Sequence, residues 1–173
     1  KINQKLFAER LDLLKKDINN FIYYLVIAGT DTSQIQGISA AGINSKARRK
    51  TALADAEFLL FGAIKNHKYK LPFLTAGVTP ALISFVCSRL IGSTPIVVPI
   101  GIEEKPYFYH LSVEDHLIGP ARCLTTGNSM NKERVFSLYT KGLEIGKSSQ
   151  KPLFISECVP GGTTTAEAVM EAF

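Results

Sequence analysis

The sequence predicts an α/β fold: a Rossmann-like, open and mostly parallel sheet flanked by helices, with an N-terminal amphipathic helix. Three apolar segments of strand length, residues 21–28, 95–100 and 152–156, alternate with segments of helical periodicity. Strands that alternate with helices in this way pair in parallel through right-handed crossovers. The chain has 173 residues, of which 46% are apolar, which is enough for a core of its own. We therefore expect a single α/β domain over residues 1–173.

The first half of the chain contains a helix, a strand, a loop and a second helix. Residues 4–19 carry apolar side chains at helical spacing with charged ones opposite, which predicts the amphipathic helix. Residues 21–28, FIYYLVIA, form a near-continuous apolar run typical of a strand buried on both faces. Residues 32–45 are rich in Gly, Ser, Thr, Asn and Gln, so we interpret them as a long functional loop. Residues 51–65 repeat apolar side chains on one face and predict the second helix.

The middle of the chain contains a helix, a strand and a long irregular segment. A Thr-Pro pair at residues 79–80 is typical of the start of a helix, and Gly92 follows its end. Residues 95–100 predict a short strand whose Pro99 places its far end outside the regular ladder. Residues 103–128 mix aromatic, acidic and turn-forming residues, and we expect mostly loop there.

The last third of the chain repeats the helix and strand pattern. Asn131 is suited to cap a helix through about residue 145, where Gly146 ends it. An apolar strand at residues 152–156 follows, and a further helix begins near Thr164. In the helix after Asn131 we expect three apolar side chains to face inward, Val135, Leu138 and Tyr139.

Composition limits the classes of partner. The net charge is +5, but basic residues are interleaved with acids apart from KARRK at residues 46–50, which we interpret as a solvated surface loop. No zinc-finger, coiled-coil or RNA-binding aromatic pattern accompanies it, so we expect no nucleic-acid partner, while an anionic small molecule fits the charge. The longest apolar run is too short to cross a bilayer, so we expect no membrane partner and a cytoplasmic location.

The cysteines and the acidic and histidine residues predict neither a disulfide framework nor a metal site. Cys87, Cys123 and Cys158 are odd in number and widely spaced, which favours free thiols. Residues 110–116 contain two histidines and two acids, but their spacing matches no closed zinc pattern. We expect surface or turn roles for them, and neither metal nor cofactor.

The segment ISECVPGGTTTAEAVM, residues 155–170, carries the main functional signal, because it combines a strand, a glycine turn and a helix start. In an open parallel sheet, ligands bind outside the carboxyl ends of the strands. Gly161 and Gly162 let the backbone approach a ligand closely, and the unpaired amides of the helix start favour an anion. The side chains of Thr163, Thr164 and Thr165 add hydroxyl donors, which complete a predicted phosphate site.

Further polar residues follow the first strand, at the same predicted edge of the sheet. The candidate substrate-binding residues there are Gly29, Thr30, Asp31 and Ser33, with Asp31 expected to face base or ribose. Other interpretations stay open: a lone Asp in such a turn is as often a turn former, and loop polarity alone explains the serine. The glycine turn is also compatible with a plain helix start capped by its first threonine. It is not a Walker loop, because Thr163 stands where lysine is required.

SECVPGGTTTA resembles the G-E-M-G-I-G-N-T-T-A segment of the nicotinate-nucleotide:dimethylbenzimidazole phosphoribosyltransferases, which make the lower ligand of cobalamin. Its V-P-G-G-T-T-T form is similar to a divergent branch of that family in archaea and cyanobacteria. VIAGTDT, residues 26–32, and residues 119–146 resemble two further family segments, although the first lacks the family's histidine. The coinciding residues are Glu157, Gly161, Thr163 and Thr164 in the terminal motif, and Met130 and Glu133 in the segment before it.

The resemblance implies transfer of 5-phosphoribosyl from nicotinate mononucleotide to the nitrogen of an aromatic base, with release of nicotinate. It implies that Glu157 binds substrate or assists proton transfer, although a satisfied carboxylate at a strand end is the other interpretation. In the family the general base lies late in a longer chain, so we expect these 173 residues to be an N-terminal part that is inactive alone. The family associates as dimers, which implies a homodimer here.

Two other functions stay open at this point. One is a non-catalytic nucleotide- or phosphate-binding regulatory module that keeps the glycine turn but has no base. The other is a structural or assembly domain in which the turn only starts a helix.

Overall fold

The structure is a computed structural model that describes residues 4–6, 8–9, 12, 20–71 and 79–172. The predicted amphipathic helix, residues 4–19, falls mostly outside the described part of the chain.

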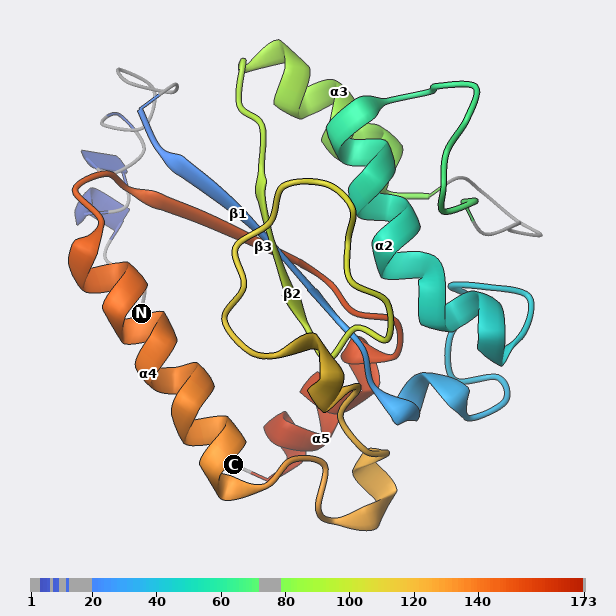
Figure 1. Ribbon diagram of the computed structural model, residues 1–173. Helices are drawn as coiled ribbons and strands as arrows, with labels where there is room; N and C mark the ends of the chain where they lie inside the picture. Colours follow the sequence, from blue (N-terminus) through green and yellow to red (C-terminus); the bar gives the residue numbers. More distant parts are fainter. Residues whose placement is uncertain (1–3, 7, 10–11, 13–19, 72–78, 173) are drawn as a thin grey trace.

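One parallel sheet forms the centre of the molecule. Its strands are β1 (Ile22–Ala28), β2 (Ile96–Ile100) and β3 (Leu153–Cys158), in the order β2-β1-β3. Both neighbours run parallel to β1, with Leu25 opposite Val97 on one side and Ser156 on the other. Helices lie on both sides of the strands (Figure 1). These features confirm the predicted Rossmann-like α/β fold.

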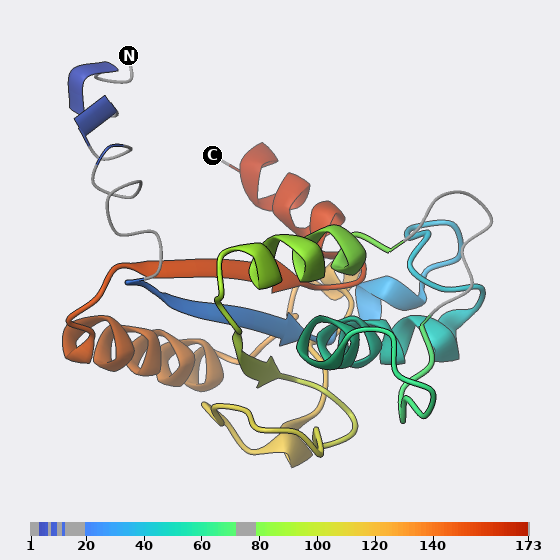
Figure 2. The same cartoon turned by 90° about the horizontal axis from the view of Figure 1, so that it is seen from above.

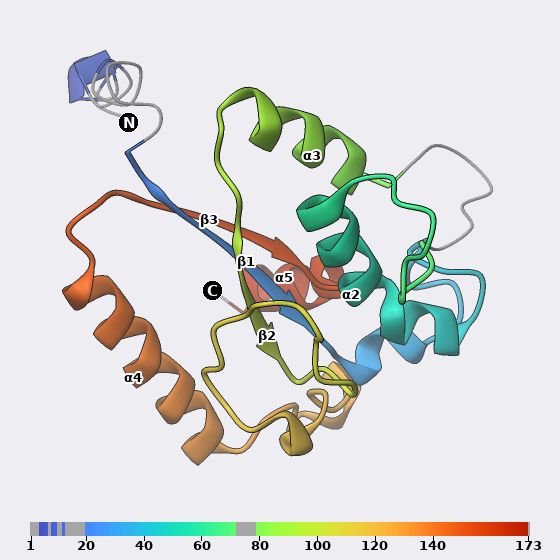
Figure 3. The same ribbon diagram turned by 45° about the horizontal axis from the view of Figure 1, so that its top comes forward.

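The helices divide between the two faces of the sheet. α2 (Ser45–Phe61) and α3 (Ala81–Leu90) contact each other on one face, and α2 also contacts β1. α4 (Lys132–Ser148) and α5 (Gly162–Glu171) lie on the other side of the strands (Figure 1, Figure 3). The chain thus crosses from β1 to β2 over one face and from β2 to β3 over the other, which reverses the strand order between β1 and β3.

The hydrophobic core lies between β1 and α2. On β1, Leu25 and Ile27 are buried, and they form one cluster with Val97 of β2 and with Leu53 and Ala56 of α2. Full burial of a side chain of this size contributes about 2 kcal/mol. The alternate residues of β1, on the opposite face, are only partly buried. The run predicted to be buried on both faces is therefore fully covered on one.

α2 begins earlier in the sequence than we predicted, at Ser45 instead of residue 51, and ends at Phe61 instead of residue 65. Asn44 caps it by accepting a hydrogen bond from the Ala47 amide at 2.9 Å. Gly62 ends it with φ +71°, a conformation that favours glycine.

The basic run KARRK was interpreted wrongly as a solvated loop, because it forms the first turns of α2. Arg48 is buried, and its guanidinium donates to the carbonyl oxygens of Ser33 and Gly42. Arg49 pairs with Asp31 and, at 3.3 Å, with Glu103. These arginines hold the segment after β1 against α2 because the carbonyls and carboxylates of that segment face the helix.

Two predictions about the other elements also differ from the structure. Pro99 lies within the ladder, opposite Ile27. Val97 accepts a hydrogen bond from Leu111 on the outer side of β2, and Pro99, two residues on, also turns its nitrogen outward. Because β2 is an edge strand, no ladder hydrogen bond is lost there.

α4 also differs, because it continues past Gly146 to Ser148. Its Val135 and Tyr139 are 47% and 62% exposed, and Leu138 is half-buried, so they do not form the expected inward face. Neither side chain finds a covering layer among the described residues. Figure 2 shows α4 set apart from α2 and α3 across the sheet.

A buried carboxylate joins α2 to two later segments. Glu57 is fully buried and accepts hydrogen bonds from the amides of Lys68 at 2.9 Å and Tyr69 at 2.8 Å, and from the Tyr107 hydroxyl at 2.6 Å. Burial by itself raises the pKa of Glu57, but these hydrogen bonds, chiefly that from Tyr107, outweigh it and hold the pKa below its ordinary value.

We predict that Glu57→Ala in the full-length protein lowers the free energy of unfolding by about 3 kcal/mol, because buried donors lose their acceptor. The decrease in the free energy of unfolding, measured by urea denaturation, should have its full size above the unfolded-state pKa of about 4.3. It should become smaller as the pH falls through the lowered folded-state pKa. Glu144→Ala is the matched control, since Glu144 makes only an exposed pair with Lys141. It should cost about 0.5 kcal/mol or less. Equal losses in the two variants would contradict this role for Glu57.

Candidate functional site

The carboxyl ends of β1 and β3 lie side by side where the strand order reverses. β1 leads toward the helices of one face, and β3 leads into α5 on the other. Loops that leave adjacent strands in opposite directions open a crevice between them, which is where ligands bind in open α/β sheets. The segments that follow these two strands contain most of the predicted site residues.

The segment after β1 begins at a glycine that the fold requires. A Cβ on Gly29 would lie 2.3 Å from the Gly101 carbonyl oxygen, closer than side chains approach. Gly29 also accepts a hydrogen bond from Ala121 at 3.0 Å, and Thr30 forms a parallel bridge with the same residue. This close packing joins the end of β1 to the loop before α4.

The polar groups after Gly29 are largely used within the protein. Thr30 caps the short 3-10 helix η1 (Asp31–Gln34) by accepting from the Thr32 amide at 3.2 Å. The Ser33 hydroxyl donates to the Thr30 carbonyl at 2.7 Å, and the Thr32 hydroxyl accepts from the Leu124 amide at 3.1 Å. All three hydroxyl residues are buried. Their hydrogen-bonding capacity therefore stabilises the segment itself.

Asp31, which was predicted to face base or ribose, pairs with Arg49 of α2. Its side chain is 40% exposed, so one side of the carboxylate still faces solvent. The ion pair makes Asp31 part of the junction between η1 and α2.

The segment after β3 packs directly on η1. Gly161 has φ +78°, and a Cβ there would lie 3.1 Å from the Ser33 amide nitrogen and 3.2 Å from its Cα. Both values are tighter than ordinary contacts, and the conformation itself favours glycine. The structure thus brings the two predicted halves of the site, Gly29 to Ser33 and Gly161 to Thr165, into contact.

The glycine turn leads into α5 without a side-chain cap. The turn closes with a hydrogen bond from Gly162 to the Val159 carbonyl at 2.8 Å, and Gly161 occupies the cap position. No threonine therefore caps this helix, contrary to the plain helix start considered above. Thr163 and Thr165 are exposed, while Thr164 is half-buried. Among the described residues, no side chain accepts from the first-turn amides of α5.

Glu157 lies on β3 opposite Val26, on the same face of the sheet as α4 and α5. Its side chain is exposed, and its Oε2 would be 3.7 Å from a Cβ on Gly162. It lines a broad, largely apolar hollow of about 860 Å³ together with Thr163, Thr165 and Arg134. Glu157 is therefore next to the glycine turn, and it lines both this hollow and the cavity on the α2 side of β3.

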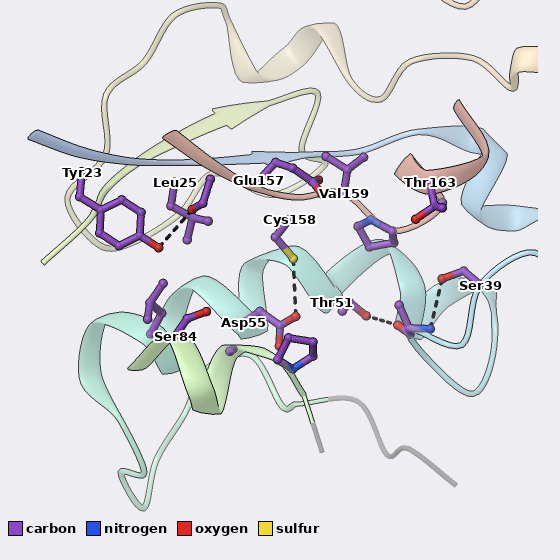
Figure 4. A pocket seen from close by; sticks show the side chains of 17 residues that line it. Tyr23, Leu25, Ser39, Thr51, Asp55, Ser84, Glu157, Cys158, Val159 and Thr163 are labelled. Atoms are coloured by element: carbon purple, nitrogen blue, oxygen red, sulfur yellow. Dashed lines mark hydrogen bonds between the residues drawn. The ribbon is translucent and has the colours of Figure 1, made fainter. Parts of the chain in front are cut away.

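A second cavity, of about 420 Å³, lies on the other face, between β3 and the helices α2 and α3. Figure 4 shows Thr163 at one end, Tyr23 at the other, and the pair Asp55 and Cys158 between them. Asp55 Oδ1 accepts from the Thr79 hydroxyl at 2.7 Å, and Oδ2 accepts from the Cys158 thiol at 3.5 Å.

Burial sets the titration of both groups in this pair. It raises the pKa of Asp55, and the hydrogen bonds from Thr79 and Cys158 offset only part of the increase. Burial, followed by the charge of Asp55, also raises the pKa of the Cys158 thiol well above its ordinary value. The thiol is therefore a weak donor and no nucleophile at neutral pH.

Sequence reasoning did not select Asp55. It lies one turn after Thr51 in the segment TALADAEFLL, in which buried positions are mostly apolar. A charged residue in such a run is a signal in itself, because carboxylates are rarely buried without a partner or a function.

The histidines and acids of residues 110–116 have structural contacts. Glu114 makes a bidentate pair with Arg134, at 2.9 and 2.6 Å, and Asp115 caps the short 3-10 helix η2 (His116–Ile118). Within the described ranges, no three His, Cys, Asp or Glu side chains are grouped so as to hold a metal ion. No described helix combines the length and the apolar character needed to cross a membrane.

Comparison with known proteins gives relatives that have the same family name. The chain is 78% identical over 171 residues to a UPF0284 protein of Prochlorococcus marinus subsp. pastoris, which covers 99% of this chain and 44% of that protein. It is 47% identical over 154 residues to one of Parasynechococcus marenigrum and 38% identical over 154 residues to one of Gloeothece citriformis, covering 39% and 41% of those proteins. No family model matches the chain. The chain is thus a partial member of the UPF0284 family and spans less than half the length of these relatives.

Proposed function

We propose that the protein to which this chain belongs is a phosphoribosyltransferase that moves 5-phosphoribosyl from nicotinate mononucleotide to a benzimidazole-type base. The observation that supports it most is the contact of the Gly161 turn with Ser33 at the reversal of strand order. A crevice at this point of an open sheet is the usual position of a nucleotide ligand. The resemblance of the turn to a phosphoribosyltransferase motif supplies the reaction class.

The phosphate site is proposed at the start of α5. A helix N-terminus presents unpaired amides and a partial positive charge, both of which stabilise a phosphate. Gly161 has no side chain to shield these amides, and the exposed hydroxyls of Thr163 and Thr165 stand beside them. The net charge of +5 also favours an anionic substrate.

The sugar and its leaving group are proposed to lie toward Glu157. Departure of nicotinate leaves positive charge on the ribose, as in glycoside transfer, and a nearby carboxylate stabilises it. Glu157 is exposed beside the glycine turn and so is accessible to a bound ribosyl group. We also propose a homodimer, as the family resemblance implies.

The direct test uses the full-length protein with nicotinate mononucleotide and 5,6-dimethylbenzimidazole. We predict release of nicotinate and formation of the base ribotide, and chromatography measures both products. Glu157→Gln should lower kcat by about 100-fold with little change in the affinity for ribose 5-phosphate, since it removes a charge that acts in the transition state. Ribotide binding with no turnover in the wild-type protein would instead support a regulatory module.

A second prediction concerns the turn itself. Gly161→Leu should weaken binding of nicotinate mononucleotide by about 100-fold, because the Leu side chain strains a positive φ and collides with Ser33. Gly142→Leu is the matched control, since Gly142 lies in α4 with open space around it. Calorimetry measures both affinities, and circular dichroism checks that each variant is folded. Unchanged affinity in a folded Gly161→Leu protein would refute the phosphate site.

A further inference from the structure

We propose that the cavity between β3, α2 and α3 binds the aromatic base, and that Asp55 accepts a hydrogen bond from a ring N–H of that base. This inference rests on the proposed function, which requires a base next to the ribotide. It assigns the base to the cavity on the α2 side of β3, which Glu157 also lines, and makes Asp55 the residue that selects for a ring N–H.

The cavity has suitable size and access. Its volume of about 420 Å³ falls within the range of small-molecule sites. Gly161 and Thr163 line one end, so a molecule in the cavity would adjoin the proposed phosphate site at the start of α5. Leu25 and Tyr23 provide apolar and aromatic surface along its length (Figure 4), and Leu59 also lines it. A planar ring therefore finds apolar walls and, between the two ends of the cavity, the partly buried carboxylate of Asp55.

Asp55 retains capacity to bind a ligand. A carboxylate offers about four acceptor positions, and the structure uses two of them, for Thr79 and for a long contact with the weakly donating Cys158 thiol. Glu57, two residues further along α2, is fully buried and takes three donors. The pKa of Glu57 is accordingly lowered, whereas that of Asp55 is raised. Asp55 is thus the under-satisfied carboxylate, and a ring N–H is the kind of donor that would complete it.

The polar residues after β1 that were predicted to bind substrate are less available to a base. Thr30 and Ser33 are buried, with their hydroxyls bound to neighbouring groups, and Asp31 pairs with Arg49. Ser39, further along the chain, lines this cavity. The polar groups that can still bind a base therefore lie on the α2 side of the sheet.

The experiment compares two bases that differ in the ring N–H. Benzimidazole carries it, and 1-methylbenzimidazole does not. Calorimetry with the full-length wild-type protein, with and without ribose 5-phosphate, should show at least about 10-fold tighter binding of benzimidazole, because an analogue without the donor leaves a buried acceptor unpaired. Asp55→Leu should weaken benzimidazole binding by about 10-fold and abolish the preference between the two bases, while ribose 5-phosphate affinity stays unchanged.

A second variant tests the cavity even if the Asp55→Leu protein does not fold. Ser84 lines the cavity from an exposed position on α3, so Ser84→Tyr should fill the cavity and abolish binding of both bases. Ser84→Ala is the matched control and should bind as the wild type does. Benzimidazole binding that survives Ser84→Tyr, or an N–H preference that survives Asp55→Leu, would overturn the inference.

The outcomes separate this inference from the proposed function. Nicotinate release by the wild type that neither Asp55→Leu nor Ser84→Tyr affects would overturn the base site and leave the transferase standing. Benzimidazole binding that depends on Asp55, in a protein without turnover, would support the base site and refute the transferase. Absence of benzimidazole binding to the wild type under both conditions would overturn the base site.

The stability of Asp55→Asn tests whether the carboxylate is under-satisfied. A folded-state pKa above the unfolded value means that stability is lost as the pH rises through it. The variant should therefore melt at a higher temperature than the wild type at pH 7, and the difference should vanish below about pH 4. Cys158 of β3 and the neighbouring Glu157 are the titratable groups near it among the described residues, and neither is altered. A less stable variant at pH 7 would identify a structural carboxylate and count against the proposal.

Discussion

The contact between Gly161 and Ser33 is the constraint on which the arrangement of the site depends. Parallel pairing of β1 with β3 brings the ends of these strands together, and the chain then leaves them toward opposite faces. The two segments meet with only 3.1 Å between a Cβ on Gly161 and the Ser33 nitrogen. Any side chain at this position would push the turn away from η1. The absence of that side chain keeps the start of α5 close to the sheet edge and open to a ligand.

Polar groups around this contact divide into those that stabilise the fold and those left for a ligand. The hydroxyl groups of Thr30, Thr32 and Ser33 form hydrogen bonds in and around η1. Arg48 and Arg49 connect η1 to α2. What stays exposed or incompletely satisfied lies on either side of the glycine turn. Glu157 lines the hollow on one side of the sheet and also the cavity on the other side, where Asp55 lies. A ligand anchored at the turn therefore has a carboxylate available in each direction, and the two have different surroundings.

The face of the sheet opposite α2 is the less covered one. α4 and α5 enclose a hollow of about 860 Å³ there, and several apolar side chains on these elements and on β3 are exposed, including Phe136, Ile155 and Met170. The chain covers 44% of its relative from Prochlorococcus marinus subsp. pastoris, so more than half of that relative lies outside the matched region.

The sequence by itself determined the rhythm of strands and helices and the two segments that meet at the site, because apolar runs, caps and glycine turns act through neighbouring residues. It predicted the three strands, the start of α4 after Asn131 and the turn at Gly161. Only the tertiary structure decided that Arg48 and Arg49 of KARRK pack inward, that Val135 and Tyr139 of α4 stay exposed and that Asp55 borders a cavity beside Cys158. Those features depend on contacts between residues far apart in the chain, such as the 103 residues that separate Asp55 from Cys158. Local periodicity carries no information about such contacts, since the partner is set by how the elements stack.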